Sequence, residues 1–206
     1  GVMTPQSVVA CNGGYHYGNR VMKCHAHASP LDMLHAIATS CNAYFAHEYR
    51  KIIEKYPTPA QGITAWGNDL RSFGFGEYLG SDFPIGRKGY IPDAAFYNRH
   101  YGENGWRATT NISNGIGQGE VLVTPLQLAN ALSAIANKGD YYTPHIVRKI
   151  DGKTTPFTQY TEVKHTRVAP QYFDPIIKGM NLSYTGGTSR GTQIDSVNVA
   201  AKTGTA

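Results

Sequence analysis

The sequence predicts a mixed α/β domain of the α+β type, in which amphipathic helices cover a small number of strands. Hydrophobic residues make up 41% of the 206 residues and charged residues only 16%, which is typical of a folded globular protein. Three helix starts repeat one signature, and strand-like stretches are few. We expect one domain over residues 1–206 that is incomplete at both ends and belongs to a longer chain.

The repeated helix start is a hydroxyl residue followed by proline, which suits a first helical position because no amide hydrogen is needed there. It occurs at Ser29-Pro30, Thr58-Pro59 and Thr124-Pro125. In the last two, Gln61 and Gln127 stand where the second half of a capping box belongs. Apolar residues at helical spacing follow each start. The expected buried face of the third helix consists of Leu128, Leu132 and Ile135, with Gly139 as its C-terminal cap.

Apolar spacing predicts two further helices, over residues 42–56 and 171–182, the second burying Tyr172, Ile176 and Met180. Strands are expected over residues 142–149 and 163–168 and from residue 197 onward. Residues 74–113 are rich in Gly, Tyr, Asn and Pro and have weak periodicity, so they predict a long irregular loop.

The charge pattern argues against a nucleic-acid partner. The net charge is +5, but the 19 Lys and Arg residues are scattered and form no basic block. The positive net charge also fits a protein that works near an anionic membrane or an anionic cell-wall polymer. No apolar run approaches the length of a membrane span.

Two short motifs carry candidate chemistry. At the end of the chain, Lys202-Thr203-Gly204-Thr205 would line a cleft with a cation and two hydroxyl donors, beside a glycine that lets a ligand backbone approach. Ser40-Cys41-Asn42 stands between two predicted helices, where helix capping is the ordinary role of such residues. Ser196-Val197-Asn198 has the same pattern but stands too close to Lys202 in sequence to face it.

In their order, these motifs resemble the transpeptidase domain of class B penicillin-binding proteins, the elongation-type enzymes more than the division-type ones. The resemblance is carried by Ser40 to Phe45, Phe73 to Gly76, Gly115 to Gly119, Thr124 to Gln127, Tyr142 to His145 and Ala201 to Ala206. It implies the penicillin-binding protein and serine β-lactamase-like fold, with an antiparallel sheet flanked by helices. It also implies a peptidoglycan D,D-transpeptidase that cross-links stem peptides through a serine acyl-enzyme.

The resemblance also implies roles for single residues. Ser40 would relay protons and Asn42 would bind the substrate amide. Lys202 would supply the cation of the cleft and share a hydrogen bond with Ser40. Thr203, Gly204 and Thr205 would hold the substrate carboxylate or that of a β-lactam. The family nucleophile belongs to a Ser-x-x-Lys motif. None of the ten serines has Lys three residues later, so we expect the nucleophile outside this chain and the chain alone to be inactive.

A structural zinc site is predicted from the first fifth of the chain. Cys24 and His27 have a spacing that lets both side chains reach one ion, and Cys11 and Cys41 would complete a closed Cys₃His set. His25 is an alternative to His27. A disulfide with one leftover thiol, or three buried thiols, are the competing interpretations. No organic cofactor is expected.

The family implies stem peptides, β-lactam antibiotics and a membrane-embedded glycosyltransferase of the elongation machinery as partners. It also implies a place in the inner membrane with this domain facing the periplasm. A non-catalytic penicillin sensor on the same fold, or a zinc-stabilised interaction module, are the alternative functions. A serine β-lactamase is disfavoured because we find no Glu-bearing loop suited to deacylation.

Overall fold

The computed structural model describes residues 2–82, 86–154, 157–194 and 196–204 of the chain. The described residues form six α-helices, which are α1 (Met33–Thr39), α2 (Asn42–Glu54), α3 (Pro59–Ser72), α4 (Ala94–Tyr101), α5 (Pro125–Ala136) and α6 (Phe173–Thr185). Single 3-10 turns lie at Ile112–Ile116, Thr158–Tyr160, Pro170–Tyr172 and Arg190–Thr192. None of the helices in this part of the chain is both long enough and apolar enough to cross a membrane.

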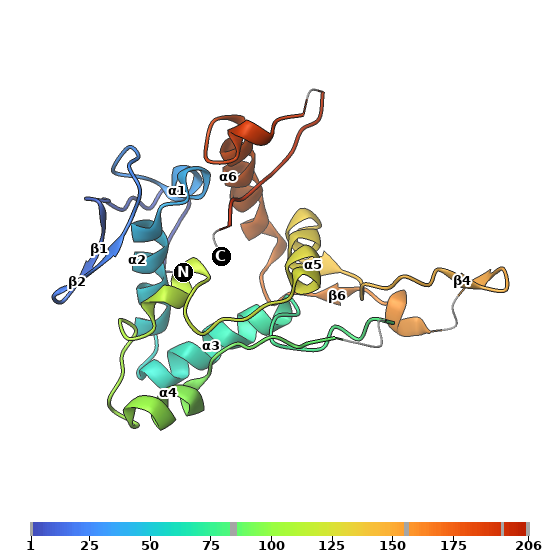
Figure 1. Ribbon diagram of the computed structural model, residues 1–206, viewed down its shortest axis with the longest axis horizontal. Coiled ribbons are helices and arrows are strands. Elements are labelled where there is room, and N and C mark those ends of the chain that lie inside the picture. Colours follow the sequence, from blue (N-terminus) through green and yellow to red (C-terminus); the bar gives the residue numbers. More distant parts are fainter. Residues whose placement is uncertain (1, 83–85, 155–156, 195, 205–206) are drawn as a thin grey trace.

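The strands are short and pair two by two. They are β1 (Gly14–Tyr17), β2 (Arg20–Lys23), β3 (Asp140–Tyr141), β4 (Lys149–Ile150), β5 (Lys153–Thr154) and β6 (Lys164–His165). Within the described residues they make three separate antiparallel pairs, β1 with β2, β3 with β6, and β4 with β5. Figure 1 shows that the β4–β5 pair lies at the tip of a long arm that projects away from the helices. The mixed helix-and-strand fold class is confirmed.

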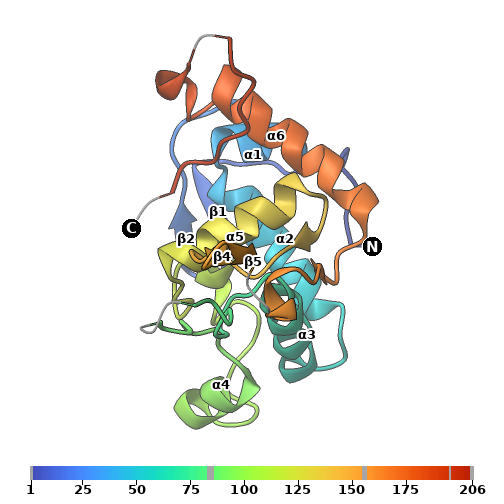
Figure 2. The same ribbon diagram turned by 90° about the vertical axis from the view of Figure 1, so that its right-hand side faces the viewer.

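Two apolar clusters hold the helices together. The first joins α1, the start of α2 and α6 through Ile37, Tyr44 and Met180, and it includes Cys11 and Cys41. The second joins the rest of α2 to α3 and α4 through Tyr49, Ile63 and Tyr97. Figure 2 shows α6 lying beside α1 at one end of the molecule and α4 at the other. Helix α2 therefore links both clusters, and the candidate site lies at its first residue.

The predicted helix start at Ser29-Pro30 is wrong, because α1 begins later. The cap is Asp32, whose carboxylate accepts a hydrogen bond from the His35 amide at 2.9 Å. The peptide bond between Ser29 and Pro30 is cis. The Ser29 hydroxyl instead accepts a bond from the Cys11 amide at 2.8 Å. Ser29 therefore fixes a distant loop rather than the helix.

The two capping boxes are confirmed at Thr58 with Gln61 and at Thr124 with Gln127. The predicted apolar face of α5 is wrong for Leu128 and Leu132, whereas Ile135 is partly buried against the first cluster. Leu128 and Leu132 are 50% and 44% exposed, whereas Gln127 is 1% exposed. The Gln127 amide donates to the carbonyls of Gly74, Glu77 and Lys88 at 2.9–3.1 Å. The buried face of α5 combines Gln127 and Asn130 with Ala131 and Ala134, and its two amide side chains satisfy backbone carbonyls of the preceding loop.

The predicted irregular loop over residues 74–113 contains α4, which was missed. Asp93 caps this helix by accepting from the Phe96 amide at 2.8 Å. The hairpin of β1 and β2 was also missed, although Gly18-Asn19 between the strands is a turn signal. In place of the expected strands at 142–149 and 163–168, the structure has the short strands β4 and β6, which pair with β5 and β3. Helix α6 has the expected place, but Tyr172 is 62% exposed rather than buried.

Candidate functional site

Ser40 lies at the junction of α1 and α2. It has the left-handed conformation, with φ of 56° and ψ of 46°, and its amide closes the end of α1 on the carbonyls of Ala36 and Ile37. Few residues other than glycine adopt this conformation, so its presence at Ser40 marks a position fixed by the surrounding structure. The turn leaves the serine half-buried, with its hydroxyl able to reach a group on another segment.

Asn42 is the first residue of α2 and is held from two sides. Its side-chain amide donates to the Lys23 carbonyl at the end of β2, at 3.0 Å. Its backbone amide donates to the Cys24 sulfur at 3.3 Å. The hairpin of β1 and β2 therefore sets the orientation of Asn42, two residues after Ser40.

Lys202 comes to the same junction from the end of the chain. Its Nζ donates to the Ser40 Oγ at 2.7 Å, across 162 positions of sequence, and to the carbonyl of Thr203 at 3.0 Å. The residue as a whole is exposed, but protein atoms around the ammonium displace enough water to lower the pKa of Lys202. The expected contact between these two motifs is confirmed. Thr205 lies outside the described residues.

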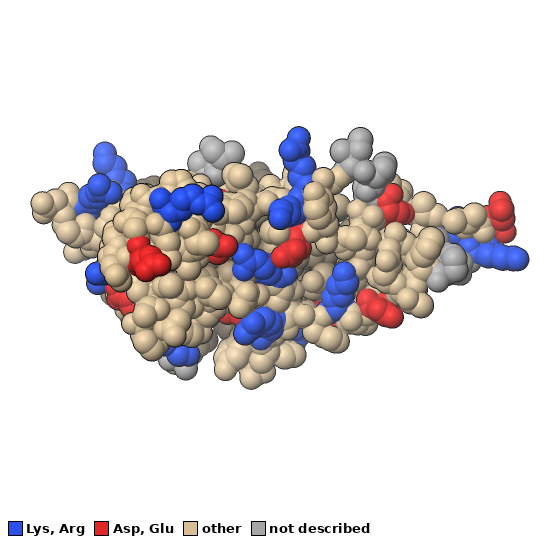
Figure 3. Space-filling model, turned by 90° about the horizontal axis from the view of Figure 1, so that it is seen from below, with Lys and Arg blue, Asp and Glu red and all other residues tan. Residues whose placement is uncertain are grey.

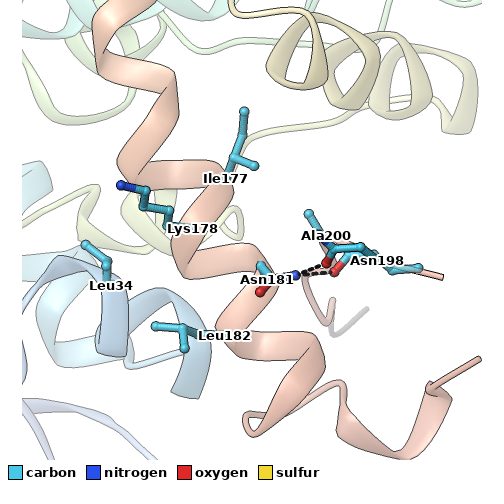
Figure 4. Close-up of a pocket in the computed structure, with 8 residues that line it drawn as sticks. Leu34, Ile177, Lys178, Asn181, Leu182, Asn198 and Ala200 are labelled. Atoms are coloured by element: carbon cyan, nitrogen blue, oxygen red, sulfur yellow. Dashed lines mark hydrogen bonds between the residues drawn. The ribbon is translucent and has the colours of Figure 1, made fainter. Parts of the chain in front are cut away.

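The segment that carries Lys202 is fastened to α6. The Asn181 side chain donates to the Asn198 side chain at 2.5 Å and to the Val199 carbonyl at 3.1 Å, as Figure 4 shows. The Ala201 amide donates to the Met180 carbonyl at 3.1 Å. The predicted strand from residue 197 forms no ladder within residues 196–204. A groove of about 540 Å³ lies between α1, α6 and this segment, lined by Leu34, Ile177, Lys178, Asn181, Leu182, Asn198, Val199 and Ala200.

The four predicted metal ligands gather beside the Ser40 junction. The ligand atoms of Cys11, Cys24, His27 and Cys41 all lie within 4.8 Å of one another. Cys24 Sγ and His27 Nε2 are 3.3 Å apart. All three cysteines are described and none forms a disulfide. His25 is not in the group; its ring packs edge-on against that of His27, with centroids 5.2 Å apart.

The three thiols differ in how readily they ionise. Burial raises the pKa of Cys41 to about 12, and Cys24 and Cys11 beside it also oppose its ionisation. Burial likewise raises the pKa of Cys11. At Cys24 burial acts in the same direction, but hydrogen bonds from His27 and the Asn42 amide outweigh it and lower the pKa. Three sulfurs so close together can all be thiolates only beside a cation.

The surface charges are mixed on the face that Figure 3 shows. Lysine and arginine side chains stand apart from one another there, with aspartates and glutamates between them. Several charged side chains of the described residues form local pairs, such as Arg50 with Glu54 at 2.8 Å and Lys138 with Asp174 at 2.9 Å. The face therefore presents small neutralised groups of charge rather than one continuous basic stripe.

Sequence reasoning missed one residue at the site, Thr188. Its hydroxyl lies 3.0 Å from that of Thr203, and its amide donates to the Ala38 carbonyl at 3.0 Å. The one available signal was the run of hydroxyl residues after the glycine pair Gly186-Gly187. That signal does not say which distant segment the loop contacts.

Comparison with known proteins shows the family to which the chain belongs. The family model described as the penicillin binding protein transpeptidase domain matches residues 1–206. The peptidoglycan D,D-transpeptidase MrdA of Acinetobacter baumannii is 30% identical over 187 residues, which are 85% of this chain and 25% of the relative. The chain thus spans about a quarter of the length of such curated relatives.

Solved structures show the same fold. PBP2 of Pseudomonas aeruginosa, solved in complex with WCK 5153, matches with a TM-score of 0.75 and 27% identity over 92% of this chain and 42% of that one. A chain of a peptidoglycan synthase complex that coordinates polymerization and crosslinking matches with a TM-score of 0.74 and 26% identity, over 93% of this chain and 30% of that one. The chain belongs to the penicillin-binding protein transpeptidase domain family and is a class B domain of the PBP2 type.

Proposed function

We propose that the whole protein is a peptidoglycan D,D-transpeptidase that cross-links stem peptides through a serine acyl-enzyme during cell elongation. The observation that carries this proposal is the 2.7 Å hydrogen bond from Lys202 to Ser40. This bond brings together the motif of Ser40 and the motif of Lys202, and acyl transfer needs side chains from both at one site. The nucleophilic serine of a Ser-x-x-Lys motif would come from a part of the protein outside residues 1–206.

Ser40 and Lys202 would move the proton of this reaction. When the nucleophile attacks the carbonyl of D-Ala-D-Ala, the carbon–nitrogen bond breaks and the departing amine needs a proton. The Ser40 hydroxyl can give its proton to that amine and take one back from the Lys202 ammonium. Partial desolvation lowers the pKa of Lys202, so its proton is released more easily than from a free lysine. The incoming amine would lose its proton by the reverse path.

The remaining site residues would bind the substrate. The side-chain oxygen of Asn42 can accept an amide hydrogen of the stem peptide, because the amide nitrogen is already engaged by Lys23. The hydroxyls of Thr203 and Thr205 would donate to the terminal carboxylate, beside Gly204. The Thr205 amide would be one oxyanion donor and the amide of the nucleophile the other.

We further propose that Cys11, Cys24, His27 and Cys41 hold one structural zinc ion. The donor set fits, because three sulfurs and one imidazole nitrogen, all within 4.8 Å of one another, have the ligand types and number that a structural zinc ion takes. The ion would supply no reaction chemistry. It would fix Cys41, which separates Ser40 from Asn42, and Cys24, whose sulfur accepts the Asn42 amide at 3.3 Å. One zinc per chain in elemental analysis supports this; no metal together with a mass lower by two hydrogens would indicate a disulfide instead.

The proposed partners follow from the same assignment. They are peptidoglycan stem peptides, β-lactams and a membrane-embedded glycosyltransferase, with no nucleic acid. The similar chain that takes part in a peptidoglycan synthase complex supports a polymerising partner. We propose a place in the inner membrane with this domain on the periplasmic side.

Two assays on the whole protein test the function. A fluorescent penicillin should label it covalently, and the isolated 1–206 chain should stay unlabelled. A D-Ala-D-Ala donor peptide with an amine acceptor should release D-Ala and give a cross-linked product. Labelling without any release of D-Ala would instead identify a penicillin sensor, and no labelling would refute both functions.

A further inference from the structure

The loop after α6 connects the two motifs of the site. Its Thr188 amide donates to the Ala38 carbonyl at 3.0 Å, only two residues before Ser40. The contact needs glycine at 187, since a Cβ there would lie 2.2 Å from the same carbonyl. The Thr188 hydroxyl reaches the other way, to the hydroxyl of Thr203 at 3.0 Å. One residue therefore bridges the end of α1 and the Lys202 segment.

The Thr188 hydroxyl belongs to a chain of hydroxyl groups that starts in the core. Ser183 on α6 is fully buried and lies 3.1 Å from the Oγ of Ser189, which is 5% exposed. Ser183 Oγ is 3.4 Å from the Thr188 hydroxyl. The chain of hydroxyl groups then ends at Thr203, which is exposed. The hydroxyls of Ser183 and Ser189 are held by the packing around them, and they in turn limit how the Thr188 hydroxyl can be oriented.

The Thr188 hydroxyl has several possible hydrogen-bond partners but only one hydrogen to donate. A threonine hydroxyl has one hydrogen to donate and two lone pairs that accept. The Ala38 carbonyl already accepts the Thr188 amide, and it lies a long 3.4 Å from the hydroxyl oxygen. Ser183 is equally far at 3.4 Å. The shorter contact, at 3.0 Å, is with Thr203, and in it either hydroxyl can be the donor.

We propose that Thr188 is a positioning residue that donates to Thr203 and thereby turns the Thr203 hydrogen toward the carboxylate of the substrate or β-lactam. This inference rests on the proposed function. A hydroxyl that accepts one hydrogen bond is a better donor of its own, and a carboxylate is the strongest acceptor it could meet there. Thr188 would touch no reacting atom and would act only through Thr203.

The test compares two β-lactams on the whole protein: benzylpenicillin, which has the free carboxylate, and its methyl ester, which lacks the charge. The measured quantity is the second-order rate of acylation. In Thr188→Val we expect a loss of about three- to tenfold for the acid and a smaller loss for the ester. Thr188→Ser restores the donor and should recover most of the rate for the acid. In a Thr203→Val protein, adding Thr188→Val should change nothing further.

Thr192 offers a matched control in the same loop. Its hydroxyl donates to the Ser189 carbonyl at 2.8 Å, within the turn itself. Thr192→Val should leave the ratio of acid to ester rates unchanged. If Val at 188 prevents folding, Thr188→Ala and Thr188→Ser give the same comparison, with thermal melting of each protein alongside.

Equal losses for acid and ester in Thr188→Val, or a further loss in the Thr203→Val background, would overturn the positioning role while the function stands. A wild-type protein that neither penicillin acylates would overturn the proposed function, and this inference with it.

Discussion

The sulfur of Cys24 accepts a hydrogen bond from the backbone amide of Asn42 at 3.3 Å. This contact ties the cysteine cluster to the helix start that carries one of the two candidate motifs. The same cluster includes Cys41, whose sulfur accepts the Tyr44 amide at 3.4 Å and so caps α2. The geometry of the site therefore depends on the state of these sulfurs.

Removing the proposed zinc ion should weaken the site as well as the fold. Stripping the whole protein with a strong chelator should lower its thermal midpoint and slow acylation by penicillin at least tenfold, because Ser40 and Asn42 lose their support. Cys24→Ser should act like the chelator, since its oxygen is a poorer zinc ligand. Restored zinc should recover the chelated wild type but not the variant. Unchanged acylation in the fully stripped protein would contradict the bracing role.

Lys202→Met should slow acylation by about a hundredfold or more without destabilising the fold. Desolvation lowers the pKa of Lys202 in the folded protein, so the unfolded chain binds its proton more tightly. Stability should then rise with pH from the folded pKa up to the ordinary lysine value of about 10.4, where the unfolded chain also loses the proton. The variant should lack that rise and melt no lower than wild type at neutral pH. Thermal melting across pH 7 to 11 checks this, and a variant that melts clearly lower would refute it.

Gln127→Leu should cost about 3 kcal/mol of unfolding free energy, because three carbonyls in residues 74–88 lose their common donor. Gln61→Leu is the matched control: Gln61 has the same place in the other capping box but is exposed. Gln61→Leu should lower the free energy of unfolding by about 1 kcal/mol or less. Chemical denaturation of both variants measures the difference. Equal losses would mean that only capping matters at Gln127.

Gly187→Ala should slow acylation and destabilise the protein by about 1–3 kcal/mol, because the new Cβ would force the loop away from the Ala38 carbonyl. Gly191→Ala is the control in the same loop, where a Cβ would meet nothing within 4 Å. Acylation rates and melting of the two variants give the comparison. A Gly187→Ala protein that behaves like the control would show that the close approach is dispensable.

The parts of the fold that depend on neighbouring residues could be predicted from the sequence. The capping boxes at Thr58 and Thr124 are such parts, because cap and helix lie within three residues. The cysteine cluster also follows from spacing, since its members fall within the first 41 residues. The contact of Ser40 with Lys202 was reached through the family resemblance rather than through any local rule.

Three of the failures, at Gln127, Ser29 and Thr188, share a cause, which is a polar side chain that serves a distant backbone group. Gln127 bonds to carbonyls 39 to 53 positions away, so α5 buries a face that periodicity takes for the exposed one. Ser29 serves the Cys11 amide, 18 positions away, instead of a helix. Thr188 meets Ala38 across 150 positions. Such contacts depend on the tertiary fold and leave no periodic signal in the sequence.

The most direct test of the account is a double-mutant cycle between Ser40 and Lys202, measured as the rate of penicillin acylation of the whole protein. If the two side chains form one proton path, Ser40→Ala and Lys202→Met should each slow acylation by about a hundredfold or more, and the double variant should be little slower than the slower single one. If the two rate losses multiply in the double variant, the residues act independently, and the proton path proposed between them is contradicted.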